Sequence, residues 1–72
     1  MTSADVFPME PIGGSTAISA AGWKYGYMRV EWKPSGLIYE YGVEERVYTL
    51  LRNAPSKGRF MKQLMASGVL VN

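Results

Sequence analysis

The sequence contains neither cysteine nor histidine. The absence of cysteine excludes a disulfide framework, and the absence of both residues excludes the usual zinc site. Histidine is also the most common general acid–base residue in enzymes, so the chain lacks that catalytic group. We therefore expect hydrophobic packing alone to stabilise the fold, and we predict neither a bound metal nor a cofactor.

Carboxylate pairs suited to catalysis are also lacking. The chain has six acidic residues among 72, and no two of them have a spacing that implies a shared site. Glu44 and Glu45 are adjacent, so on a helix their side chains point about 100° apart and cannot face each other. Their expected role is to favour a helix N-terminus through the helix dipole. We expect a protein without enzymatic activity.

Long apolar runs are absent from the chain. No run approaches the roughly 18 residues of a membrane-spanning helix, and residues 1–14 lack the basic and then apolar segments of a secretion signal. The 72 residues are enough for one small domain, and such a domain buries only about 60% of the surface of its unfolded chain. The sequence predicts a soluble cytoplasmic monomer without a membrane partner.

Three stretches favour β-strands and are separated by turns that contain glycine or proline. They are residues 17–23, 27–33 and 37–41. The two-residue alternation is clearest in the second stretch, where Met28, Val30 and Trp32 are expected to face the core. Gly22 in the first stretch is expected to mark a bulge. Together the three stretches predict an antiparallel meander.

From residue 43 onward the apolar spacing changes to that of helices. The first predicted helix has an apolar face that consists of Val47, Leu50, Leu51 and Ala54. Pro55 is expected to end it, and Ser56 to cap a second helix over about residues 57–66 that Gly68 stops. The apolar stripe of the second helix consists of Phe60, Met61, Leu64 and Met65.

These elements predict an α+β fold: a three-stranded antiparallel β-meander, two C-terminal helices packed on one of its faces, and a flexible N-terminal leader. Residues 1–14 form the leader, and residues 15–72 form the domain. An isolated sheet of this size is marginal, so helix packing must provide most of its stability. Residues 69–71 are too apolar for an inert tail, and they either dock against the sheet or add an edge strand.

The leader is unusually apolar for a disordered segment. Its large side chains are Val6, Phe7, Met9 and Ile12, and two prolines lie among them. One interpretation is that Phe7 or Ile12 folds back and covers the sheet. The other is that the four side chains form an extended recognition segment, which the prolines keep extended so that little entropy is lost on binding. The residues alone leave both open.

Aromatic side chains are concentrated in the predicted sheet, which contains or adjoins seven of the nine. Trp32, Tyr39 and Tyr41 are expected to fill the core beneath the helices. Tyr25 and Tyr27 are expected on the surface near Arg29. There they either stack on single-stranded bases or anchor a protein interface.

Charge is divided unevenly along the chain. Residues 1–45 carry three basic and six acidic side chains, whereas residues 46–72 carry five basic side chains and no acidic one. This division favours an acidic partner or a phosphate backbone near the second helix, although a solvated helix surface accounts for it equally well. At the start of that helix, Ser56 with Lys57 and Arg59 either binds an anion or caps the helix alone. Lys62 extends the basic surface.

The motifs around the first predicted helix resemble those of the KTSC domain. They are Tyr39-Glu40-Tyr41, then Val47-Tyr48-x-x-Leu51, then Ser56-Lys57-Gly58-Arg59-Phe60. The resemblance covers roughly residues 14–65. KTSC domains occur alone in bacteria and phages and at the carboxyl end of some lysyl-tRNA synthetases. RNA binding is the function that the resemblance implies, here through Tyr25, Tyr27 and the basic second helix.

The whole chain, leader included, further resembles small transcription regulators of lytic Xanthomonas phages. That resemblance implies a partner, the β and β′ subunits of host bacterial RNA polymerase, with NusA and nascent RNA as further participants. It also implies that σ-dependent initiation is inhibited and termination is suppressed, in the cytoplasm of the infected host. The expected contacts are Val6, Phe7, Met9 and Ile12 in the leader, with Arg29, Lys57, Arg59 and Lys62 as basic anchors.

Overall fold

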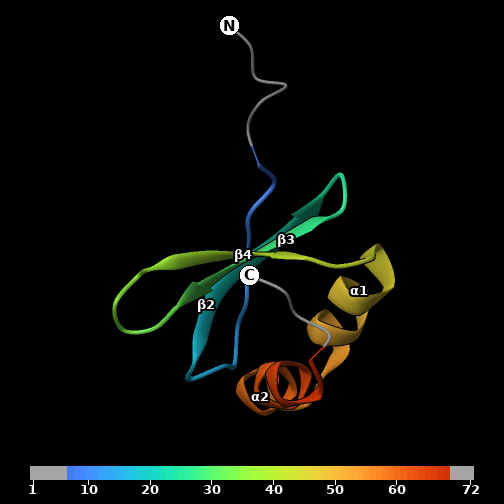
Figure 1. The fold of residues 1–72 in the computed structure, drawn as a ribbon. Coiled ribbons are helices and arrows are strands. Elements are labelled where there is room, and N and C mark those ends of the chain that lie inside the picture. Colours follow the sequence, from blue (N-terminus) through green and yellow to red (C-terminus); the bar gives the residue numbers. More distant parts are fainter. Residues whose placement is uncertain (1–6, 69–72) are drawn as a thin grey trace, which may run out of the picture.

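The computed structural model describes residues 7–68, and it contains one antiparallel sheet with two helices against one of its faces (Figure 1). The elements are β1 (Glu10–Pro11), β2 (Ile18–Lys24), β3 (Tyr27–Trp32), β4 (Ile38–Gly42), α1 (Glu45–Asn53) and α2 (Lys57–Ser67). The strand order is β1-β2-β3-β4, so each strand lies beside its neighbours in the sequence. The predicted α+β class and both helices are confirmed, whereas the prediction of three strands is wrong.

The additional strand, β1, comes from the segment that was predicted to be a flexible leader. Glu10 pairs with Ala21, Pro11 pairs with Ala20, and the Ile12 N–H donates to the Ser19 carbonyl at 2.9 Å. Pro11 is tolerated because a proline on an edge strand loses no ladder hydrogen bond. Ile12 packs against the core, so this residue folds back onto the domain. Arg52 of α1 forms an ion pair with Glu10, which joins β1 to the first helix.

The turns follow from residues with positive φ angles. A two-residue turn joins β2 to β3, and its residues Tyr25 and Gly26 have φ angles of 51° and 86°. Such a pair is the type I′ geometry that suits the twist of a hairpin. The bulge in β2 lies between Ile18 and Ala20, not at the predicted Gly22.

The core lies between the sheet and the helices, where eight hydrophobic side chains are buried. They are Ile18, Ala21, Met28, Val30, Tyr41, Val43, Leu51 and Met61. As predicted, Met28 and Val30 of β3 point toward the helices, and Trp32 packs half-buried against the same cluster. Within residues 7–68, neither helix is long and apolar enough to cross a membrane.

As the sequence predicted, α1 ends before Pro55 and α2 begins after Ser56, whereas α2 extends one residue beyond the expected end at residue 66. Ala54 has extended geometry before Pro55 and follows the last residue of α1. The Ser56 hydroxyl accepts a hydrogen bond from the Arg59 backbone N–H at 3.4 Å, and Gly68 ends α2 with a φ of 79°. Local capping chemistry therefore fixes these boundaries.

Three predicted core positions are wrong. Leu50 in α1 is 57% exposed and Met65 in α2 is 48% exposed, because each helix contacts the sheet through a narrower face than its apolar stripe. Tyr39 is 46% exposed because β4 is an edge strand that the helices cover only in part. Residues 69–71, for which docking or an added strand was predicted, lie outside the described residues.

Residues 8 and 9 approach β2 so closely that only glycine fits at position 22. A Cβ atom at this position would lie 2.2 Å from the Pro8 carbonyl oxygen. Residues 8 and 9 therefore cross the sheet face directly above Gly22. This face is opposite the helices, because Gly22 alternates along β2 with Ala21 and Trp23, which face the core.

We predict that Gly22→Ala destabilises the protein by about 1–3 kcal/mol, because the added methyl group must displace Pro8 or β2. Gly13→Ala is the matched control, since no atom lies within 4 Å of a Cβ at that position. Urea unfolding followed by tryptophan fluorescence measures both free energies. Equal values for the two variants would contradict the close approach.

A second prediction separates the two adjacent leucines of α1. Leu51 is 0% exposed, so Leu51→Ala should lower the free energy of unfolding by about 2–5 kcal/mol. Leu50→Ala should change it by less than about 0.5 kcal/mol, because Leu50 lies on the solvent side of the helix. The same urea titration distinguishes them, and a larger effect at Leu50 would show that α1 packs through a different face.

Candidate functional site

The sheet has one face beneath the helices and one face turned away from them (Figure 1). On the second face, cross-strand neighbours bring together Gly22, Arg29 and Glu40, and the chain at residues 7–9 crosses above Gly22. This surface, the open face, consists of Phe7, Met9, Tyr27, Arg29 and Glu40. It contains four of the residues that the sequence identified as partner-binding candidates.

Arg29 is the centre of the open face. Its guanidinium carbon lies 4.4 Å from the centroid of the Phe7 ring, and its Nε lies 3.2 Å from a carboxylate oxygen of Glu40. The cation–π contact holds Phe7 against the sheet, while the ion pair orients the guanidinium. Both side chains of the ion pair are partly exposed, so the pair contributes at most about 1 kcal/mol. Arg29 therefore positions Phe7, and its guanidinium already has a carboxylate partner.

Tyr25 and Tyr27 extend the aromatic surface toward the β2–β3 turn. Tyr25 is 84% exposed at the tip of the hairpin, and the Lys24 ammonium lies 5.3 Å from its ring centroid. Tyr27 is 51% exposed, and its ring lies across Gly42 of the neighbouring strand. Both tyrosines are on the surface, as predicted. Their rings are available for stacking or for contact with a protein.

The basic cluster of α2, formed by Lys57, Arg59 and Lys62, lies on the helical side of the molecule. The Lys57 ammonium donates a hydrogen bond to the Ala54 carbonyl at 2.7 Å and so caps the end of α1. Arg59 and Lys62 are exposed. The structure therefore divides the predicted contacts between two opposite surfaces. Ile12 packs against the core and belongs to neither, and Val6 lies outside the described residues.

The N-terminus of α2 lies against the loop before β2. A Cβ atom at Gly58 would lie 3.0 Å from that of Ala17, so this glycine allows α2 to approach the residue just before β2 closely. The Ser15 hydroxyl accepts hydrogen bonds from the N–H groups of Ala17 and Ile18. Since the Ser56 hydroxyl and the Lys57 ammonium already have partners within the protein, capping accounts for both residues.

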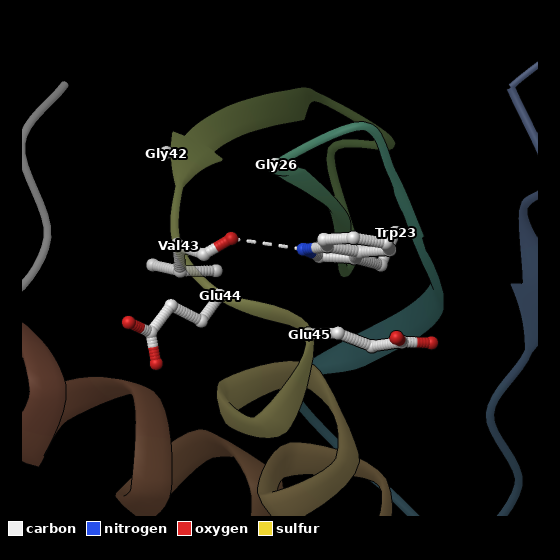
Figure 2. Close-up of a pocket in the computed structure, with 6 residues that line it drawn as sticks. All are labelled: Trp23, Gly26, Gly42, Val43, Glu44 and Glu45. Atoms are coloured by element: carbon white, nitrogen blue, oxygen red, sulfur yellow. Dashed lines mark hydrogen bonds between the residues drawn. The ribbon is translucent and has the colours of Figure 1, made fainter.

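A shallow depression lies where β4 leads into α1, and sequence reasoning did not identify it (Figure 2). Its lining residues are Trp23, Gly26, Gly42, Val43, Glu44 and Glu45. The Trp23 indole N–H donates to the Val43 carbonyl at 2.9 Å, which fixes the ring beside the two glutamates. Glu44 pairs with Arg46 at 2.6 Å, a contact between two exposed side chains at the start of α1.

The surfaces described above provide side chains for contact with a partner. Burial raises the pKa values of the Tyr41 and Tyr48 hydroxyls, so both remain protonated at neutral pH. The Tyr48 hydroxyl donates to the Ala21 carbonyl at 3.4 Å and serves the packing of α1 on the sheet. Among residues 7–68, no three His, Cys, Asp or Glu side chains are grouped so that they could hold a metal ion. The described surface offers a partner exposed aromatic rings, charged side chains and aliphatic side chains such as those of Leu37 and Ile38.

Comparison with known proteins identifies one family. The model of the KTSC domain matches residues 14–66, which span β2, β3, β4, α1 and nearly all of α2. No curated protein and no solved structure gives a significant match. The matched residues contain all three motifs around α1, while β1 and Phe7 precede them. Because the match covers most of the chain, the protein belongs to the KTSC domain family.

Proposed function

We propose that this protein is a phage-encoded, non-enzymatic transcription regulator that binds the RNA polymerase of the bacterial host. It acts on the β and β′ subunits, inhibits σ-dependent initiation and suppresses termination, together with NusA. The choice of partner rests on the resemblance of the whole chain to small phage regulators. The observation that supports a binding role is the open face, where Arg29 holds Phe7 on the same side of the sheet as the exposed Tyr27.

A protein of 8.0 kDa can regulate polymerase by occupying an interface that another factor needs. A tenfold displacement requires only about 1.4 kcal/mol of differential binding free energy. Aromatic and arginine side chains dominate the energetics of protein interfaces, and the open face combines Phe7, Tyr27 and Arg29. Its composition therefore fits a protein partner of modest contact area.

Pre-organisation strengthens this proposal. Residues 10 and 11 pair with β2, Ile12 packs on the core, and Phe7 rests on Arg29. A segment that is already ordered loses less conformational entropy when it binds. In the proposal, Phe7 and Met9 are presented to polymerase by the sheet and do not fold on contact. The protein acts as a monomer in the cytoplasm of the infected host.

We predict that the double variant Phe7→Ala/Met9→Ala binds immobilised RNA polymerase about tenfold more weakly, because two apolar contacts are lost. Leu50→Ala is the matched control, since Leu50 is an exposed apolar residue on the helical side. Biolayer interferometry with core enzyme and holoenzyme measures the dissociation constants. Deletion of residues 1–13 is a poorer test, because it also removes β1. Unchanged affinity of the double variant would contradict the proposed contacts.

Direct RNA binding is the second candidate function, and the exposed tyrosines favour it. Tyr25 and Tyr27 lie beside Lys24 and Arg29, an arrangement of rings and cations that suits single-stranded bases. Arg59 and Lys62 provide further positive charge, but on the opposite side of the domain. In this second function, the bases of an RNA strand would stack on Tyr25 and Tyr27.

Salt dependence separates the two functions. Under the proposed regulator function, we expect the affinity for polymerase to change little between low and moderate salt. We also expect the Tyr25→Asn variant to bind single-stranded RNA no differently from the wild-type protein. Asparagine is chosen because it tolerates the positive φ of residue 25. An RNA-binding module predicts instead that the logarithm of the affinity falls with that of salt, with a slope of about −0.7 per phosphate contacted. Fluorescence anisotropy with labelled RNA would detect this outcome, which would favour the second function.

A further inference from the structure

The outer edge of β4 is unpaired among the residues that the structure describes. Antiparallel ladders alternate between residues that bond inward and residues that bond outward. Along this ladder the Trp32 N–H donates to the Leu37 carbonyl, and the Val43 N–H donates to the Gly26 carbonyl. Odd-numbered residues of β4 therefore bond to β3. The N–H and carbonyl groups of Ile38, Glu40 and Gly42 point away from the sheet.

At the N-terminal end of β4, the side chains along this outer edge are apolar. Leu37, Ile38 and Tyr39 are 57%, 52% and 46% exposed. Because side chains alternate along a strand, the three residues present apolar surface on both sides of the free edge. Natural edge strands are usually protected by lysine, proline or a bulge. β4 contains none of these, and the one charged side chain that it carries, Glu40, is paired with Arg29.

The other end of the edge is acidic. Glu40 is partly exposed, and Glu44 and Glu45 follow the strand after Val43, at the depression beside Trp23. Figure 2 shows the two side chains extending to opposite sides of that depression. Glu40 and Glu44 each have one arginine partner, and both carboxylates remain accessible. A segment beside β4 thus meets apolar side chains first and carboxylates next.

A second copy of the chain fits this edge poorly. The symmetric antiparallel register that aligns all five residues of β4 places Glu40 opposite Glu40 of the copy, and like charges in such a pair are destabilising. The register that places Ile38 opposite Ile38 brings Pro34 opposite Gly42, which shortens the ladder. A strand of different sequence avoids both problems.

We propose that the free edge of β4 docks an extended segment of a partner protein, which adds a strand to the sheet. Apolar side chains of the segment pack against Leu37, Ile38 and Tyr39. A lysine or arginine of the segment lies near Glu40, Glu44 and Glu45. This inference does not depend on the proposed function, because it specifies the chemistry of the added strand and not the protein that supplies it.

NMR spectroscopy of the full chain with a synthetic probe peptide tests the docking site. The probe is a capped peptide of about eight residues, with two lysines followed by alternating valine and threonine. An antiparallel strand of this sequence places its lysines near Glu44. We expect slower hydrogen exchange at the outward amides of Ile38, Glu40 and Gly42. A matched peptide with glutamate in place of lysine should bind about tenfold more weakly.

Two substitutions at one position isolate the role of the backbone. Ile38→Pro removes an outward N–H, which the fold does not use, whereas Ile38→Thr keeps it. We expect the proline variant to bind the lysine peptide about tenfold more weakly than the threonine variant, with both melting near the wild-type temperature. Glu44→Lys/Glu45→Lys leaves the strand intact, and it should reverse the preference between the two peptides.

Three results would overturn the proposal. One is equal binding of the lysine peptide to the two residue-38 variants, and another is no binding at millimolar peptide. The third is a concentration-dependent dimer in sedimentation experiments that Ile38→Pro abolishes, since the edge would then be an interface between copies of this chain.

Discussion

Two short helices cover only one face of the sheet, and this constraint determines how the rest of the chain is used. The helices bury Met28 and Val30 completely, whereas the opposite face receives only the segment above Gly22. That segment approaches so closely that a single methyl group at residue 22 would collide with the backbone. The open face is therefore partly covered by backbone and partly formed by exposed side chains, and most of the predicted contacts that are not on α2 lie there.

The same constraint makes the two edges of the sheet different. On one side, β1 pairs with β2, and the Arg52–Glu10 ion pair joins it to α1. On the other side, the outer edge of β4 has no pairing partner within residues 7–68, and Ile38 and Tyr39 of this strand are about half exposed. Apart from Glu40, this edge has none of the charged residues, prolines or bulges that commonly protect edge strands. Its exposure is easier to understand as a binding feature than as a packing feature.

Sequence reasoning succeeded where the determinants are local. Pro55 ends α1, Ser56 caps the start of α2, and Gly68 ends α2. Capping and backbone geometry, which neighbouring residues alone decide, account for these three boundaries. The alternation in β3 likewise identified the buried and exposed sides of the strand. The exposure of Tyr25 and Tyr27 followed from the same pattern and from their position at the turn.

The remaining features depend on contacts between distant parts of the chain. A strand of two residues that includes a proline has no detectable period, so β1 was missed. The role of Gly22 depends on Pro8, and the position of Phe7 depends on Arg29, which is remote in sequence. Leu50 was misplaced because periodicity defines an apolar stripe but not how much of that stripe a small sheet can cover. These features become visible only in the three-dimensional structure, where distant parts of the chain are in contact.

The open face and the edge of β4 are continuous. Tyr27 lies across Gly42, and Arg29 bonds to Glu40, so both side chains border the strand whose outer backbone groups are free. A strand added to β4 would enlarge the sheet beside these residues, and one partner would then contact backbone, apolar and charged groups together. The basic cluster of α2 would remain exposed on the opposite side.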